Sequence, residues 1–344
     1  MLLELMNQQS ILDSYFDIKP KEQKIPKVFY LNWKKSKAYP VSQATFYDEL
    51  PSTLKYNYEY KIHWKEYKSY LFVYGLIDKT DDLYNYQIVN KMLITDTNFL
   101  KSQLQKAVRR QLVNVAVQTA NDMIKLSISD LLRRLPIIML EDTVLHESFS
   151  TLIWLMINID NPKFHLTKNM VKWILGIVEM ITLIDKKWEI PSLLPDEKFK
   201  ILDYGLLHMN NGHSSCLHAI LLRRSYGGMK CDMRFLMDCF KYYYENAENA
   251  LHFSTKSKSI ELTVTSMKRN DYLSCAYDFH VNPTIITIIS NEHDVDNIKD
   301  LIWKFSSSIN KRLLNSDVSD IDDWKKIEPI YTKLTEYYLN KLII

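Results

Sequence analysis

The chain has 344 residues, 47% of them hydrophobic, which is enough for one large domain or two smaller ones with a substantial core. Its 6 glycines argue against glycine-rich barrels, and its net charge of +3 argues against a uniformly basic nucleic-acid binder. Charged residues interrupt the apolar runs before they reach membrane-spanning length, so no membrane association is expected. Four cysteines without a signal peptide predict free thiols in an intracellular, reducing compartment.

We expect residues 1–25 to form a disordered tail, because the first residues of a chain are seldom tied down. The tail contains QSILDSYF, in which one 3₁₀ turn would place Leu12, Tyr15 and Phe16 on one side as an apolar plug. The Gln9 amide could then bond to backbone groups at the rim of a pocket. This pattern resembles the PIP box, the motif by which replication and repair proteins bind the eukaryotic or archaeal sliding clamp (PCNA). The resemblance implies a PCNA-like sliding clamp as partner. The alternative is an amphipathic N-terminal helix that packs on its own domain.

Three runs rich in aromatic and β-branched residues, VFYLNW, LKYNYEYKIHW and SYLFVYGLI, predict strands. They predict a small α+β N-terminal subdomain over residues 26–100. Aromatic and basic residues in this region could stack on single-stranded bases, although alternating aromatics more often pack in a core. These residues are Tyr56, Tyr58, Tyr60, Lys61, Trp64, Lys65, Tyr67 and Lys68.

Residues 101–344 show helical spacing and predict a helical domain, so the expected fold is mainly α with a small β-containing N-terminal subdomain. Apolar residues three or four apart predict one helix from Leu104 to Met123. A polar break at Ser127–Asp130 follows, with Ser129 as a candidate N-cap. Pro136 predicts a kink or two short helices, because proline lacks an N–H and clashes with the preceding turn.

Three further features complete the helical prediction. The apolar stretch from Thr151 to Ile159 belongs in the core. An amphipathic helix is expected between Asn161 and Pro191. The Gly227–Gly228 step should separate two helices, because glycine allows positive φ.

Paired arginines recur in the predicted helices. Guanidinium groups suit bidentate contact with phosphate, so these residues are candidates for binding nucleic acid, with DNA as a candidate partner. The alternative is internal ion pairing, for example between Arg134 and Glu141 or Asp142. The candidates are Arg109, Arg110, Arg133, Arg134, Arg223 and Arg224.

The order of LQKAVRR, LLRRL and then Glu-Asp resembles the C-terminal helical region of the RarA/MgsA replication-associated ATPases, which are relatives of clamp loaders. The resemblance implies a helical scaffold role for residues 103–150. The matching residues are Arg109, Arg110, Arg133, Arg134, Leu135, Glu141 and Asp142. The sequence has no G-x-x-x-x-G-K-[ST] loop, and Gln111 stands where the family has a small residue, so neither ATP hydrolysis nor a cofactor is expected.

Carboxylate and imidazole groups offer candidates for catalysis. Glu141, Asp142 and His146 form one set, and Asp278 and His280 form another. If the two sets met, they would make a divalent-metal phosphodiesterase site. The spacing of the other histidines and cysteines fits no common zinc pattern, so no metal site is expected. Those residues are His213, Cys216, His218 and Cys231.

The sequence therefore favours a DNA replication or repair accessory protein. It would be tethered to the sliding clamp, have a helical body that binds DNA or a partner, and be located in a nucleus or viral replication compartment. A metal-dependent DNA-processing enzyme is the first alternative, and a structural or interaction protein is the second.

Overall fold

The computed structural model describes residues 26–33, 44–85, 94–184, 211–246, 265–273, 276, 296–298, 300–301 and 318–342. The clamp-binding motif with Gln9, Leu12, Tyr15 and Phe16, and the candidate pair Asp278 and His280, lie outside the described residues.

A four-stranded mixed sheet is built from the N-terminal part of the chain, with strand order β2-β1-β4-β3. Strands β1 and β4 run parallel, while β2 and β3 pair antiparallel at the two edges. The runs VFYLNW and SYLFVYGLI form β1 and β4 completely, and β3 is the second half of the predicted middle run. The short β2 was not predicted, because three residues are too few to show alternation. The strands are β1 (Val28–Trp33), β2 (Thr45–Tyr47), β3 (Tyr58–Trp64) and β4 (Ser69–Ile77).

The residue before β1 is already tied into this sheet. The Lys27 N–H donates to the Tyr47 carbonyl at 3.0 Å, and the Lys27 carbonyl accepts from the Phe72 N–H at 2.8 Å. These bonds extend the sheet's hydrogen bonding to Lys27, one residue before β1.

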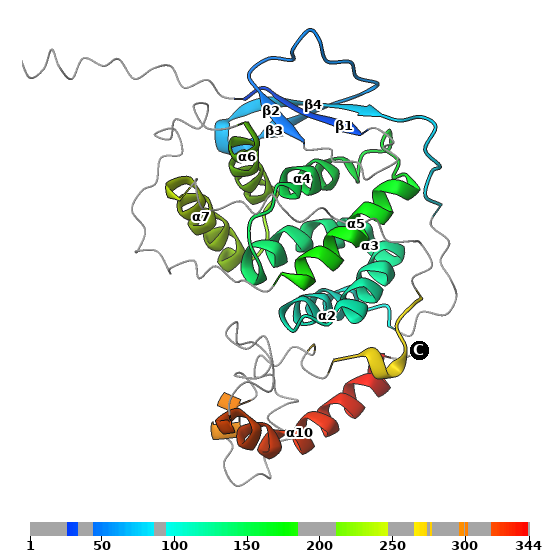
Figure 1. Cartoon of the computed structure of the whole chain (residues 1–344), viewed down its shortest axis with the longest axis vertical. Helices are drawn as coiled ribbons and strands as arrows, with labels where there is room; N and C mark the ends of the chain where they lie inside the picture. The colour runs from blue at the N-terminus through cyan, green and yellow to red at the C-terminus, as the bar shows by residue number, and fades with distance from the viewer. Residues whose placement is uncertain are drawn as a thin grey trace, which may run out of the picture.

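Helices cover one face of the sheet, as Figure 1 shows with the sheet at the top and the helices below it. The predicted mainly α fold with a small β-containing N-terminal part is confirmed. The α-helices are α2 (Thr97–Arg109), α3 (Val113–Asp142), α4 (Ser148–Asn158), α5 (Lys168–Leu183), α6 (Asn211–Ser225), α7 (Lys230–Glu245) and α10 (Val318–Leu342), with 3₁₀ turns η1 (Lys65–Tyr67) and η4 (Arg269–Asp271).

Helix α4 is the centre of the hydrophobic core, because every one of its residues is buried. Its Trp154 lies against Gly75 of β4, where an added Cβ would be only 2.9 Å from the indole Cζ2 atom. The indole N–H also donates to the Tyr74 carbonyl at 3.1 Å. The sheet and the helices thus share one continuous core, in which residues 26–100 and the helical region pack together.

The helix predicted from Leu104 to Met123 is wrong in one respect, because two helices occupy this stretch. Helix α2 ends at Arg109, and Gln111 takes a left-handed conformation with φ 57°. The Gln111 N–H bonds to the Val108 carbonyl at 3.0 Å and the Leu112 N–H to the Ala107 carbonyl at 2.9 Å. This is the Schellman pattern, in which glycine usually holds the left-handed position. Because glutamine holds this position instead of glycine, the sequence does not mark the end of the helix.

The predicted break at Ser127–Asp130 is confirmed, but its cap and the role of the proline differ from expectation. Ser127 has non-helical torsions, φ −159° and ψ 86°, and its Oγ accepts from the Asp130 N–H at 3.4 Å. Ser127 rather than Ser129 therefore caps the second half of α3. The backbone torsions stay helical through the buried Pro136, so the helix is not divided into two at the proline. The break lies nine residues before the proline, at Ser127, where the serine hydroxyl accepts from a backbone N–H of the following turn.

The remaining helical predictions hold. Helix α5 lies within the predicted Asn161–Pro191 range and is capped by Thr167, whose Oγ accepts from the Met170 N–H at 3.2 Å. Gly227 and Gly228 separate α6 from α7 with φ values of 75° and 151°. Within the described ranges, none of the helices combines the length and the apolar character needed to cross a membrane.

Candidate functional site

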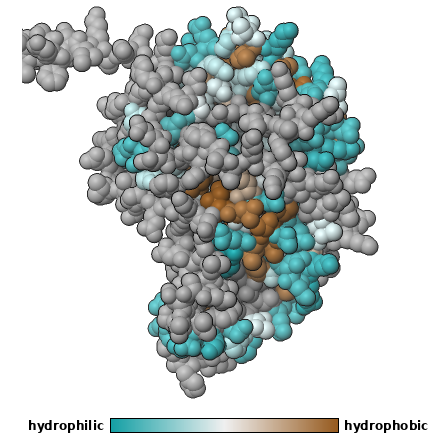
Figure 2. All heavy atoms as spheres, in the orientation of Figure 1, coloured by the Kyte–Doolittle hydropathy of each residue, from teal (hydrophilic) through white to brown (hydrophobic). Residues whose placement is uncertain are grey.

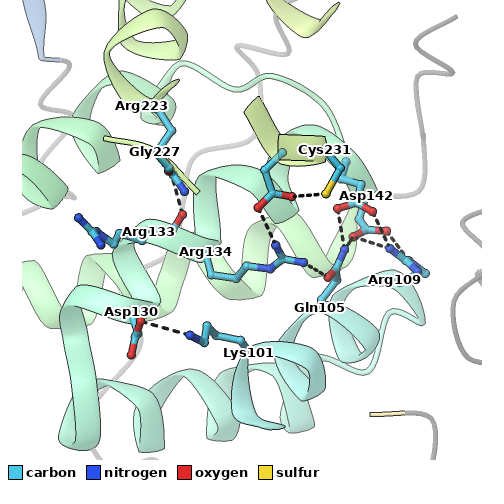
Figure 3. Close-up of polar contacts among 12 residues, drawn as sticks. Lys101, Gln105, Arg109, Asp130, Arg133, Arg134, Asp142, Arg223, Gly227 and Cys231 are labelled. Carbon is cyan, nitrogen blue, oxygen red and sulfur yellow. Dashed lines mark hydrogen bonds and ion pairs between the residues drawn. The ribbon is translucent and has the colours of Figure 1, made fainter. Parts of the chain in front are cut away.

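A charged cluster lies where α2, α3 and α7 meet (Figure 3). We call it the arginine–carboxylate network. At its centre, Arg109 Nε donates to Asp142 Oδ1 at 2.5 Å, and Arg109 Nη2 donates to Glu141 Oε1 at 3.2 Å. The Arg109 and Asp142 side chains are only 3% and 1% exposed. Its members are Gln105, Arg109, Arg134, Glu141, Asp142 and Asp232.

Gln105 joins the two halves of this network. Its Nε2 donates to Glu141 Oε2 at 2.8 Å and to Asp142 Oδ2 at 3.1 Å. Its Oε1 accepts from Arg134 Nη2, and Arg134 Nη1 in turn lies 3.6 Å from Asp232 Oδ2 on α7. Gln105 and Arg109 are one helical turn apart, so both face the end of α3 where the carboxylates lie. The sequence analysis did not identify Gln105 or Asp232, which no motif singles out.

Burial dominates the electrostatics of the network. Desolvation raises the pKa of the Glu141 carboxyl, and the neighbouring Asp142 raises it further. Arg109 and Arg134 act in the opposite direction by favouring the ionised form. Because the guanidinium of Arg109 already occupies the carboxylate oxygens, the arrangement is suited to joining α2 to α3.

The six candidate arginines are placed very differently from one another. Arg109 and Arg223 are buried, at 3% and 5% exposure. Arg223 Nε donates to the Arg133 carbonyl at 3.1 Å, and its Nη1 donates to the Gly227 carbonyl at 2.9 Å. Burial, aided by the nearby Arg133, lowers the pKa of Arg223 to about 10. Contact of either buried arginine with a phosphate would require these internal bonds to break.

The other candidates lie nearer the surface. Arg224 Nη1 is 2.8 Å from Glu66 Oε1 in the β3–β4 connection. Arg110 and Arg134 are half-buried, while Arg133 is exposed and remains a candidate for phosphate contact. Internal ion pairing thus accounts for several of these residues, although the direct partner of Glu141 and Asp142 is Arg109 rather than Arg134.

The first set of catalytic candidates is engaged inside the protein. Glu141 and Asp142 belong to the network described above, and His146 Nδ1 accepts from the Ser148 N–H at 3.1 Å and lies 2.8 Å from Ser148 Oγ. Convergence with Asp278 and His280 is untested, since that pair lies outside the described residues. The described ranges contain no group of three or more His, Cys, Asp or Glu side chains placed to hold a metal ion.

The histidines and cysteines considered as zinc ligands are engaged elsewhere or differ in burial. His213 Nε2 bonds to the Tyr243 carbonyl at 2.8 Å, and His218 Nδ1 bonds to the Ser214 carbonyl at 2.8 Å. Cys216 is buried and Cys231 is exposed. Desolvation lowers the pKa of His218 to about 4, so this imidazole is neutral at physiological pH.

The aromatic residues of the sheet divide between its two faces. Tyr58 and Trp64 are buried in the core, as expected for alternating aromatics. Tyr70, Phe72 and Tyr74 of β4 point to the opposite face, away from Leu71 and Val73, and were missed as a surface feature. The alternation in SYLFVYGLI could have revealed them, because every second side chain of a strand shares a face.

Figure 2 also shows an apolar patch at mid-height, where α2 and α5 lie in Figure 1. Two exposed leucines belong to this part of the chain. Leu112, between α2 and α3, is 37% exposed, and Leu183, at the end of α5, is 60% exposed.

Searches against protein-family models, curated proteins and solved structures found no match to this chain.

Proposed function

We propose that this protein is a DNA replication or repair accessory protein that is tethered to a PCNA-like sliding clamp by its N-terminal tail. The observation that carries the proposal is the motif from Gln9 to Phe16, with every position of the clamp-binding pattern filled. An aliphatic side chain followed by two aromatic rings suits an apolar pocket, and such rings commonly supply most of the energy of an interface.

The described body is compatible with an accessory role. The acidic pair that the enzymatic alternative requires, Glu141 and Asp142, is bonded to Arg109. A cation would have to displace this guanidinium before it could use those oxygens. The proposal therefore assigns the network to holding the helices together, and leaves contact with DNA or a partner to exposed groups such as Arg133.

Isothermal titration calorimetry of the full chain with a purified PCNA-type clamp tests the tether. The Tyr15→Ala/Phe16→Ala variant should bind at least about 100-fold more weakly, because both aromatic anchors are removed. The matched control is Ser10→Ala/Ser14→Ala, which changes two spacer positions and should bind as the wild type does. Circular dichroism should show the same thermal midpoint for all three proteins.

Three outcomes would contradict the proposal: no heat of binding with the wild type, equal affinity of the anchor variant, or equal loss in both variants. A lower thermal midpoint in the anchor variant would support the alternative in which the tail packs on its own domain.

A further inference from the structure

The face of the sheet that the helices leave uncovered carries a line of aromatic side chains. Tyr70, Phe72 and Tyr74 alternate along β4 with Leu71, Val73 and Gly75, which face the core. Tyr56 extends the line, because its ring lies 4.5 Å from that of Tyr74. We call Tyr56, Tyr70, Phe72 and Tyr74 the outer aromatic row.

The outer face of the sheet is exposed over β3 and β4 but covered over β1. On β1, the outward residue Tyr30 is buried, and its hydroxyl donates to the Lys55 carbonyl at 2.8 Å. The segment that contains Lys55 therefore covers β1. By contrast, Tyr70 is 56% exposed and Tyr56 is 45% exposed, which is unusual for large aromatic side chains.

Positive charge accompanies the rings. Lys61 of β3 is paired with Phe72 across the two strands. Its Nζ lies 4.0 Å from the centre of the Tyr70 ring and 5.2 Å from that of Phe72. Lys65 and Lys68 are exposed in the connection between the strands. A polyanion with flat apolar faces matches this combination.

The two acidic residues near the row differ in their partners. Glu66 is in an ion pair with Arg224 at 2.8 Å and accepts from the Ser225 hydroxyl at 2.5 Å, on the side that packs against α6. Glu59 lies opposite Tyr74, is exposed, and accepts from the neutral Tyr74 hydroxyl at 3.4 Å. The three exposed lysines around the rings outnumber Glu59, so the charge presented there is positive.

The spacing of the rings distinguishes between nucleic-acid forms. The Phe72 and Tyr74 rings are nearly parallel, with an interplanar angle of 13° and centroids 6.4 Å apart. Stacked bases in a duplex repeat about every 3.4 Å along each strand. Rings at nearly twice that distance, which is the usual spacing of alternate side chains on a strand, suit bases that are splayed apart, and a single strand presents its bases in this way without the cost of breaking base pairs.

We propose that the outer aromatic row, together with Lys61, is a binding platform for single-stranded nucleic acid, with bases stacked on the rings and a phosphate near the lysine. The inference goes beyond clamp binding and rests on different residues, so each proposal can fail without the other.

Fluorescence anisotropy of the full chain with a labelled oligothymidine, and with a duplex of equal length, tests the platform. The single strand should bind more tightly than the duplex. Tyr70→Ala should weaken binding by roughly 5- to 100-fold, the range expected for one stacked base. Tyr70→Phe should keep the affinity, because stacking needs the ring and not the hydroxyl.

Tyr60→Ala is the matched control, since Tyr60 is a tyrosine of the neighbouring strand, is 38% exposed, and points to the other face of the sheet. It should bind as the wild type does. Lys61→Gln should flatten the dependence of log K on log salt by roughly 0.7, the contribution of one phosphate on a single strand. The Tyr15→Ala/Phe16→Ala variant should bind the oligonucleotide normally, which separates this site from the clamp motif.

The proposal is overturned if the oligothymidine does not bind at low salt, as would be found if the face were instead occupied by a protein partner. Equal binding of duplex and single strand, or a Tyr70→Ala variant that binds as the wild type does, would also overturn it.

Discussion

The arginine–carboxylate network and the outer aromatic row contradict the usual roles of their residue types. Arginines commonly contact phosphate, yet Arg109 is buried and bonded to Asp142 and Glu141. Aromatic rings commonly fill cores, yet Tyr70 is 56% exposed. The comparison teaches that the identity of a residue suggests its chemistry, while its partners decide whether that chemistry is available.

The largest expected effect comes from breaking the network. Arg109→Ala would leave Asp142, which is 1% exposed, without its main cationic partner. The free energy of unfolding should fall by about 3–5 kcal/mol, because an uncompensated buried charge remains. Urea denaturation measures this change. The exposed Arg133→Ala should stay within about 0.5 kcal/mol of the wild type, and equal losses in the two variants would refute the contrast.

Acid should destabilise the interface between the sheet and α6. The His218 ring packs beside the Phe46 and Trp64 rings, with centroid distances of 5.3 Å and 6.2 Å, and burial lowers its pKa from 6.5 to about 4. The unfolded chain therefore binds a proton more readily than the folded one between these two values. Stability should be complete above pH 6.5 and fall by up to about 3 kcal/mol as the pH approaches 4.

Urea denaturation between pH 7 and pH 4.5 measures this effect. The His218→Gln variant should show a smaller loss of stability over the same range, since glutamine does not titrate. An identical pH dependence in the two proteins would show that His218 is not responsible.

The contact between the sheet and α4 should tolerate little added volume. In Gly75→Ala, the new methyl group would lie 2.9 Å from Trp154 Cζ2, so we expect a loss of about 1–3 kcal/mol in denaturation experiments. Trp154→Phe removes the indole atoms that the new methyl group would meet. The double variant should therefore lose less stability than the sum of the losses in the two single variants. If the two losses of stability simply add, the new methyl group is accommodated by movements other than that of the Trp154 ring.

The smallest expected effect on stability is at the outer aromatic row. Tyr70→Ala should change the free energy of unfolding by no more than about 0.5 kcal/mol, because the side chain is 56% exposed. The same variant should lose much of its affinity for a single strand. A large loss of stability without a loss of binding would show that Tyr70 serves to stabilise the fold and not to bind nucleic acid.

Much of the fold could be predicted from local patterns. Alternation revealed β1, β3 and β4, and apolar spacing revealed α5 and the buried α4. The end of α2 was missed because Gln111 adopts a conformation that glycine normally marks. Pro136 suggested a division of the helix, but α3 continues through it among buried neighbours.

The candidate site was harder to predict for a different reason. Asp142 is 33 residues from Arg109 in the chain, and Asp232 reaches Arg134 from another helix. Such pairings depend on how helices pack, which periodicity does not encode. Arg134 was expected to meet Glu141 and Asp142 because it is close in sequence, whereas packing brings Arg109 to them instead.

The anchoring of Lys27 between Tyr47 and Phe72 has a geometric consequence. Only residues 17–26 separate the last ring of the clamp motif from that anchor, and the distance from Phe16 to Lys27 is at most about 40 Å. On the two proposals taken together, a molecule bound to a clamp would keep its outer aromatic row within this distance of the ring. Binding of a nearby single strand would then be governed by effective concentration, and lengthening the linker should weaken that binding while leaving both contacts intact.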